Sequence, residues 1–356
     1  MNIESLDKLL DIQPVAAVIH PASLLYLSSM PRVLTDPATL LAEFDIPIPI
    51  KEERILVLGS MHPFSVRLPV VSVEHDPFTS KLNSLLPGGY EFLRGVMFCQ
   101  SQIAKRIAEE TSSYDTIVTL FVDGLSYTEF RDYIGCEPCL VDGLTTTPDG
   151  FSRLIGNPPI SSRLFKRGFH TRLGFSYWDR DNNKLTDTIF DGIPNTKRVT
   201  NFDDVLSHLE TSDLKGAYIQ IVRAGLDHLS HSRNREKPPV QAVVDALRQD
   251  IDRLIHLLQT KPGRSKLYVS SDHGILWKHL HSLQAIDESA GRVPARYYER
   301  HPGNKPFLPL VSQGNRLYCL TYPYIRRQLA ADEAGCHGGL SYQESIIPFC
   351  SVEINT

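Results

Sequence analysis

The sequence predicts an α/β protein whose central β-sheet is largely parallel. Four apolar runs rich in β-forming residues lie at 116–122, 217–222, 266–271 and 315–322. Between the second and third runs, apolar residues recur with helical spacing over 240–260, which predicts an amphipathic helix. Strands that alternate with helices usually form a parallel sheet covered by helices on both faces, and we expect that arrangement here.

The elements that precede this core predict a two-part organisation. Residues 1–88 combine short apolar runs with many prolines, and we expect them to form an N-terminal accessory lobe. Helical spacing over 88–113 predicts one helix that leads into the core. The remainder, 89–356, is expected to be a catalytic domain, with a cap insert at about 276–330.

Composition excludes several classes of protein. The chain has 356 residues, of which 42% are hydrophobic and 22% charged, as in an ordinary globular protein rather than a disordered or fibrous one. A formal net charge of -4 gives no overall electrostatic reason for nucleic-acid binding. The first residues lack the pattern of a signal peptide, and no run approaches the ~18 apolar residues of a spanning helix. We therefore expect a cytoplasmic protein without a membrane partner.

The six cysteines are too widely spread to resemble a disulfide framework. Cys136 and Cys139 form an isolated C-x-x-C motif with no second pair at zinc-ribbon spacing. We expect both to be reduced and to lie in a turn, with redox chemistry or metal binding as the alternatives.

Six side chains that commonly bind metals lie in four short segments that follow predicted strands or lie in predicted turns. They are Asp123 in FVDGLS, Asp227 and His231 in GLDHLSH, Asp272 and His273 in SSDHG, and His337 in CHGGLS. In parallel sheets, sites form at the carboxyl ends of strands, where three of these segments are expected. Each residue alone is common in turns, caps or cores, but six together suit two adjacent divalent ions.

The spacing divides the ligands into two sets. Asp227 and His231 are four residues apart, so a helical turn places them on one side, and His337 completes a set typical of catalytic zinc. The second set, Asp123, Asp272 and His273, is richer in oxygen and suits zinc, manganese or magnesium. A hydroxyl nucleophile is also needed, and the run Thr145, Thr146 and Thr147 offers three candidates.

These motifs resemble, in order, those of the alkaline phosphatase superfamily: FVDGLS, the threonine run, DHLSH, SDHG and HGGLSYQESIIP. The segments VDGLSYTEF and HGGLSYQESIIP are most similar in sequence to the PglZ-type branch of this superfamily. The resemblance covers about 115–350 and implies an alkaline-phosphatase-like three-layer sandwich with the two ligand sets above. Members place the nucleophile ten residues before a glycine, which from Gly156 points to Thr146, with Thr145 and Thr147 as alternatives.

The resemblance implies a hydrolase of phosphoric esters that depends on two divalent ions. Zinc is the expected ion, and manganese or magnesium are alternatives. We expect a phosphodiesterase that acts on nucleotides or oligonucleotides through a phosphothreonine intermediate. The alternatives are a phosphomonoesterase, a phosphomutase, and a catalytically idle adaptor whose metals only support the core. A sulfatase is disfavoured, because TTTPDGFSR contains no C-x-P-x-R or S-x-P-x-R segment.

Substrate contacts are expected from a stretch in which cations and aromatic rings alternate, RVPARYYERHPGNK at 292–305. Arg296 and Tyr297 are the residues proposed from it, since a cation can hold phosphate and a ring can stack on a base of single-stranded nucleic acid. A second basic stretch lies at 163–172, and both stretches are equally compatible with solvated surfaces. Ser341 and Glu344 have the spacing of a capping box, which predicts a short helix just after His337.

Overall fold

The computed structural model describes the strands at 16–19, 39–42, 54–58 and 70–73 and residues 80–355, except 134, 178–182, 232–237, 288–292 and 313. The chain divides into two compact units, 1–98 and 99–356, each described separately below. In the described part of the chain, no helix combines the length and hydropathy needed to cross a lipid bilayer.

The first unit contains a four-stranded parallel sheet in the order β2-β3-β1-β4. Its strands are β1 Ala16–Ile19, β2 Thr39–Ala42, β3 Arg54–Leu58 and β4 Val70–Val73, and helix α4, Ser80–Val96, follows them.

The single helix predicted over 88–113 is wrong, because the chain is extended at Cys99. The Cys99 amide donates to Gln102 Oε1 at 2.8 Å, and Cys99 forms a bridge with Leu140. Three short helical elements of the second unit follow Cys99: η2 Gln100–Gln102, α5 Ile103–Glu109 and η3 Glu110–Ser113.

The second unit is built on a seven-stranded sheet in the order β6-β18-β10-β5-β9-β7-β8. The strands are β5 Thr116–Asp123, β6 Cys136–Leu140, β7 Thr171–Tyr177, β8 Asn195–Arg198, β9 Ala217–Ala224, β10 Ser265–Ser271 and β18 Ile346–Ile354. All pairs are parallel except the two made by β18, which is antiparallel to both β10 and β6.

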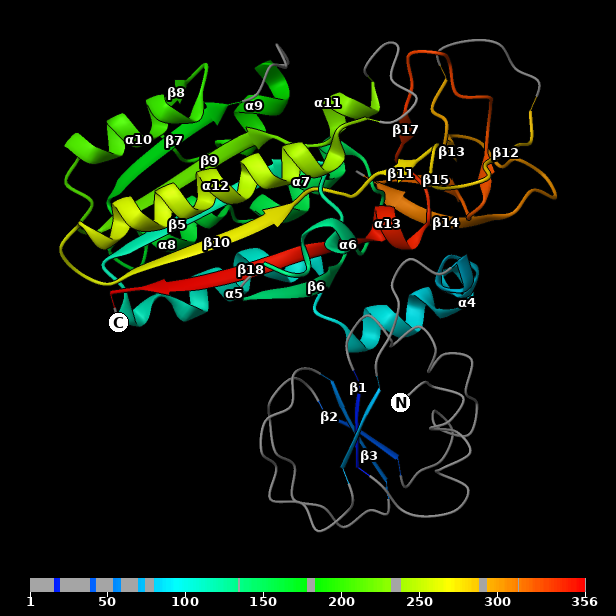
Figure 1. Cartoon of the computed structure of the whole chain (residues 1–356), viewed down its shortest axis with the longest axis horizontal. Coiled ribbons are helices and arrows are strands. Elements are labelled where there is room, and N and C mark those ends of the chain that lie inside the picture. The colour runs from blue at the N-terminus through cyan, green and yellow to red at the C-terminus, as the bar shows by residue number, and fades with distance from the viewer. Residues whose placement is uncertain are drawn as a thin grey trace. The chain divides into compact units, whose positions relative to one another are not determined.

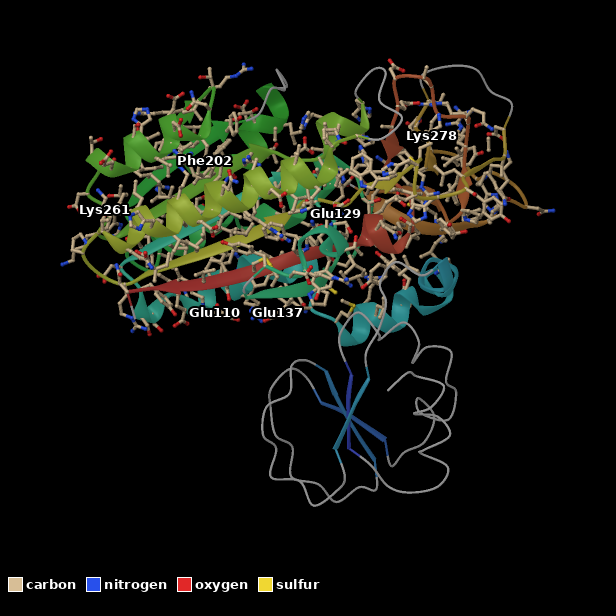
Figure 2. The ribbon with its side chains drawn as sticks, viewed as in Figure 1. Glu110, Glu129, Glu137, Phe202, Lys261 and Lys278 are labelled. Carbon is tan, nitrogen blue, oxygen red and sulfur yellow. A yellow bond between two sulfur atoms is a disulfide. The ribbon has the colours of Figure 1, made fainter. Side chains whose placement is uncertain are left out.

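Helices cover both faces of this sheet (Figure 1). On one face lie α10 Phe202–Thr211 and α12 Val240–Gln259, whose buried side chains share a core with alternate residues of β5, β9 and β10. Phe202, labelled in Figure 2, and Leu254 are part of this core. On the other face, α5 packs against α7 Thr147–Ile155 and α8 Ile160–Phe165. The predicted α/β class with a largely parallel sheet is confirmed.

Three of the four predicted strands, β5, β9 and β10, are neighbours in the main sheet, but the fourth is not in it. The run at 315–322 forms β15 Asn315–Leu320, which pairs with β14 Phe307–Ser312 and β13 Tyr297–Tyr298 in a separate antiparallel sheet. Two more small sheets lie in this region: β11 Leu276–Trp277 with β17 Gly335–Cys336, and β12 Gln284–Ala285 with β16 Tyr324–Ile325. All three lie beside one end of the main sheet (Figure 1).

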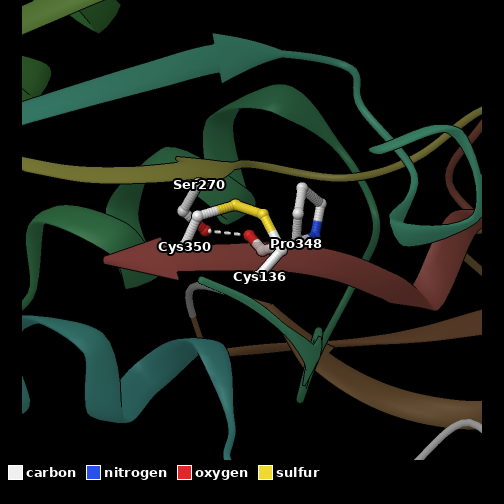
Figure 3. Close-up of a disulfide and its surroundings, with 4 residues drawn as sticks. All are labelled: Cys136, Ser270, Pro348 and Cys350. Carbon is white, nitrogen blue, oxygen red and sulfur yellow. Dashed lines mark hydrogen bonds between the residues drawn. A yellow bond between two sulfur atoms is a disulfide. The ribbon is translucent and has the colours of Figure 1, made fainter. Parts of the chain in front are cut away.

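Strands β6 and β18 carry a feature that the sequence analysis missed, a disulfide between Cys136 and Cys350 (Figure 3). The register places these two cysteines directly opposite each other, and it also places Pro138 opposite Pro348. The expectation of two reduced cysteines in a turn is wrong for Cys136, because C-x-x-C lies on a strand whose partner is 214 residues away in sequence. Cys139 is free and buried.

Candidate metal centre

The ligand segments of neighbouring strands meet at one edge of the main sheet. Asp123 is the last residue of β5, Asp272 follows β10, and Asp227 begins the short helix α11, Asp227–Ser230, just after β9. These three strands are adjacent and parallel, so their carboxyl ends lie together. His337 reaches the same edge from the segment that follows β17.

The first ligand group consists of Asp227, His231 and His337, whose candidate ligand atoms all lie within 4.8 Å of one another. Asp227 Oδ1 is 3.2 Å from His337 Nε2 and 3.6 Å from His231 Nε2. Asp227 is fully buried, whereas the side chain of His231 is 52% exposed. This group is therefore open to solvent on the His231 side.

The second ligand group consists of Asp123, Asp272 and His273, again with candidate ligand atoms within 4.8 Å of one another. His273 Nε2 is 3.2 Å from Asp272 Oδ2 and 4.0 Å from Asp123 Oδ1. All three residues are buried. Burying carboxylates this close together is unfavourable unless a cation compensates their charge, so the donor set fits a metal ion.

The two groups adjoin through stacked imidazoles. The ring centroids of His273, from the second group, and His337, from the first, are 4.0 Å apart with an angle of 12° between the planes. The structure thus gathers all six residues that the sequence analysis selected into one site. The residues of both groups fit divalent cations.

Backbone groups fix the orientation of the ligands. The Nδ1 atoms of His337 and His273 lie 3.0 Å and 3.1 Å from the carbonyl oxygens of Thr145 and Gly274, which leaves Nε2 directed at the site. Asp272 Oδ1 accepts from the amide of Gly124 at 2.9 Å. A side chain at Gly150 on α7 would collide with the backbone of Asp272, so glycine allows this helix to approach the ligand loop closely.

Charge within the first group favours ionised Asp227. Burial opposes ionisation, but His337 and His231 overcome it and hold the pKa of Asp227 well below its usual range. The pKa of His337 is raised, because the attraction of Asp227 outweighs the effect of burial. A bound divalent ion would supply the positive charge that a protonated imidazole otherwise supplies beside the Asp227 carboxylate.

The three candidate nucleophiles differ in their surroundings. Thr147, 1% exposed, has its hydroxyl 3.2 Å from His273 Nε2 and 3.5 Å from Asp123 Oδ1. Thr146, which precedes α7 as its N-cap and is half-buried, donates its hydroxyl to Asp149 Oδ2 at 2.7 Å. Thr145 is buried and donates to the carbonyl of Gly339 at 2.9 Å.

Asp149 is a residue of the site that the sequence analysis missed. It is 8% exposed, and it also accepts a hydrogen bond from Ser312 at the end of β14. Its position three residues after Thr146, in the first turn of a helix, was the available signal, but an acidic residue there is common for helix stability alone.

The two residues proposed for substrate contact, Arg296 and Tyr297, have different surroundings in the structure. Arg296 is completely buried and bidentate with Glu344, at 3.1 Å and 2.7 Å, so its guanidinium is engaged in the core rather than available to a ligand. Tyr297 is half-buried, and a Cβ on Gly338, next to His337, would lie 3.1 Å from its ring. Tyr297 therefore lies beside the site, whereas Arg296 supports it from within.

Two cations of the first basic stretch are engaged in ion pairs within the described residues, since Arg296 pairs with Glu344 and Lys305 pairs with Asp287. Arg292 lies outside the described residues. The second stretch, 163–172, leads into the amino end of β7, whereas the ligands lie at the carboxyl ends of its parallel neighbours.

The predicted helix after His337 is confirmed as α13, Tyr342–Ser345, with Ser341 accepting from the Glu344 amide at 3.2 Å. The Glu344 carboxylate accepts from the Gly339 amide at 3.0 Å in addition to holding Arg296. Glu344 thus connects the start of α13 to the loop that carries His337.

No protein-family model matches this sequence, and no curated protein sequence matches it. Among solved structures, murine ectonucleotide pyrophosphatase/phosphodiesterase 5 is similar, with 13% identity, a TM-score of 0.44, and coverage of 66% of this chain and 87% of that one. The periplasmic domain of the phosphoethanolamine transferase EptC from Campylobacter jejuni is also similar, with 13% identity, a TM-score of 0.32, and coverage of 70% and 82%. We infer the function from the residues of the site itself.

Proposed function

We propose that this chain is a phosphoric ester hydrolase that depends on two divalent ions and prefers phosphodiesters, as a PglZ-type member of the alkaline phosphatase superfamily. The observation that carries the proposal is the pair of ligand groups joined by the stacked rings of His273 and His337, with the Thr147 hydroxyl 3.2 Å from His273 Nε2 and Thr146 adjacent to Thr147 in the chain. Two adjacent ions beside a hydroxyl nucleophile are suited to in-line displacement at phosphorus.

Asp227, His231 and His337 would hold one ion, and Asp123, Asp272 and His273 the other. Zinc suits the imidazole-rich first group, and zinc, manganese or magnesium suits the second. Bound ions would supply positive charge to the transferring phosphoryl group and favour ionised oxygen nucleophiles at neutral pH.

We propose Thr146 as the nucleophile and keep Thr147 as the alternative, because its hydroxyl lies beside the ligand atoms His273 Nε2 and Asp123 Oδ1. Thr146 is half-buried, so an incoming ester can approach its hydroxyl, whereas Thr147 is enclosed. In the proposed reaction on a diester, Thr146 Oγ1 loses its proton and forms a bond to phosphorus while the bond to the leaving oxygen breaks, giving a phosphothreonine that still carries the second organic group. Water then attacks the same phosphorus and restores the threonine.

Nucleotides or oligonucleotides are the substrates that we propose. The ring of Tyr297 lies next to Gly338 at the site and offers a surface on which a base could stack. The cytoplasmic location expected from the sequence stays a prediction, and the Cys136–Cys350 disulfide is more typical of oxidising compartments.

The test compares purified protein, loaded with zinc or manganese, on bis(p-nitrophenyl) phosphate and on p-nitrophenyl phosphate. We expect faster release from the diester. Faster release from the monoester would favour the phosphomonoesterase, and absence of release from both esters in a metal-loaded protein would overturn the proposed hydrolase.

Two variants separate the threonines. Thr146→Ala should lower kcat by at least about 10³-fold with unchanged metal content, because it removes the attacking oxygen. Thr147→Ala should retain measurable turnover and a phosphothreonine detectable by mass spectrometry after rapid quenching. The reverse pattern would assign the nucleophile to Thr147.

A further inference from the structure

Asp149 places a carboxylate beside the proposed nucleophile. Its Oδ2 accepts from the Thr146 hydroxyl at 2.7 Å, and its Oδ1 accepts from the Ser312 hydroxyl. Both oxygens of the Asp149 carboxyl group are therefore engaged by neighbouring hydroxyls. Asp149 also lies in the first turn of the nine-residue helix α7, where the helix dipole stabilises negative charge.

The charge of Asp149 reaches the space in front of Thr146. Burial, Glu299 and Asp149 all raise the pKa of Tyr297, so the carboxylate acts on the ring that lies at the site. A Cβ on Gly338 would be 3.1 Å from the Tyr297 ring and 3.6 Å from the Thr146 methyl group. Tyr297 and Thr146 therefore converge on the segment that carries His337.

Nearby basic side chains do not neutralise this carboxylate. Within the part of the chain that the structure describes, no lysine or arginine forms an ion pair with Asp149. Arg153, on the same helix, donates instead to Gln100 and to the Leu144 carbonyl, and Arg296 is held by Glu344. Among the described residues, the negative charge beside Thr146 is therefore not part of an ion pair with a lysine or an arginine.

We propose that Asp149 determines the substrate class by disfavouring dianionic phosphomonoesters relative to monoanionic phosphodiesters; this inference rests on the proposed function. A monoester at neutral pH carries one more negative charge than a diester. That additional charge would lie close to the Asp149 carboxylate, and repulsion between like charges in a partly buried site is much stronger than in water. A diester carries an organic group in place of the additional charge.

The decisive variant is Asp149→Asn. Asparagine keeps an oxygen that can accept from Thr146 and an amide that can donate to Ser312, but it removes the charge. We expect the ratio of kcat/KM for bis(p-nitrophenyl) phosphate to that for p-nitrophenyl phosphate to fall by roughly tenfold or more. The ratio cancels any loss of nucleophile activation that affects both esters equally.

A second readout does not depend on turnover. Calorimetric titration of the zinc-loaded protein at pH 8 compares inorganic phosphate, mostly a dianion, with dimethyl phosphate, a monoanion. Asp149→Asn should bind phosphate roughly tenfold more tightly and change dimethyl phosphate binding little. If the wild type hydrolyses neither ester but the variant shows this shift in binding, the proposed function fails and the role of Asp149 stands.

Two matched variants serve as controls. Asp142→Asn removes one charge from the same unit, at a side chain that is hydrogen-bonded to Ser101. It should leave unchanged both the ratio of kcat/KM values for the two esters and the ratio of affinities for phosphate and dimethyl phosphate. Ser312→Ala removes the other hydrogen bond of Asp149 without changing its charge, and it should also leave them unchanged. Equal ratios in the wild type and Asp149→Asn, or an equal shift in Ser312→Ala, would overturn the inference.

Discussion

Glu129 is a carboxyl residue of the second unit that belongs to neither ligand group. This residue, labelled in Figure 2, lies on α6, Tyr127–Phe130. Its Oε1 accepts from Trp277 Nε1 at 2.6 Å and its Oε2 from the Ser126 amide at 2.9 Å. Enclosure of the carboxyl group outweighs both hydrogen bonds and raises the pKa of Glu129 to about 7.

This raised pKa predicts a pH dependence of stability. The folded state binds the Glu129 proton more tightly than the unfolded chain does, so its contribution is present below about pH 4.5 and is lost as the pH rises to about 7. Glu129→Gln cannot titrate. We expect the difference in unfolding free energy between variant and wild type to shift in favour of the variant by about 2 kcal/mol from pH 5 to pH 8. Urea unfolding of the metal-free proteins would measure it, and a constant difference would contradict the prediction.

At the scale of elements, α13 and the His337 loop depend on a buried ion pair. Arg296 and Glu344 are both completely buried and 2.7 Å apart, and Glu344 also holds the Gly339 amide. Removing one partner of such a pair leaves an uncompensated buried charge. The pair therefore fixes the loop between β17 and α13, which carries His337.

Arg296→Ala should lower the unfolding free energy by about 3–5 kcal/mol, as measured by denaturant titration, and weaken binding of the ion held by His337. Lys105→Ala is the matched control, because Lys105 pairs with Glu109 on the exposed surface of α5. That variant should change stability by no more than about 0.5 kcal/mol. Similar losses in the two variants would contradict the buried role of Arg296.

For the whole second unit, the Cys136–Cys350 disulfide joins strands from distant parts of the chain. Strand β6 precedes the threonine run, and β18 follows α13 and the His337 loop. Closing a loop of 214 residues restricts the unfolded chain strongly. The disulfide is therefore expected to stabilise the unit that contains both halves of the site.

Reduction of the wild type should lower the unfolding free energy by about 2–4 kcal/mol, as measured by guanidinium unfolding with and without a reductant. A Cys136→Ser and Cys350→Ser double variant should have the stability of the reduced protein and should not respond to the reductant. A response in the double variant would show that the reductant acts elsewhere.

The α/β class, the strands β5, β9 and β10 and the helix α12 could be read from the sequence, and so could the six residues that the structure gathers into one cluster; that these six bind metal stays a prediction. The signals are local: buried parallel strands are continuous apolar runs, a helix face repeats every three to four residues, and an acidic residue ends or follows each of the three strands.

The pairing of distant segments could not be read from the sequence and is shown by the structure. The structure places β15 in a separate sheet, Cys136 opposite Cys350, Arg296 in the core with Glu344, and Asp149 between the hydroxyls of Thr146 and Ser312. Strand register, burial and charge pairing depend on residues far apart in the chain, so local spacing cannot predict them.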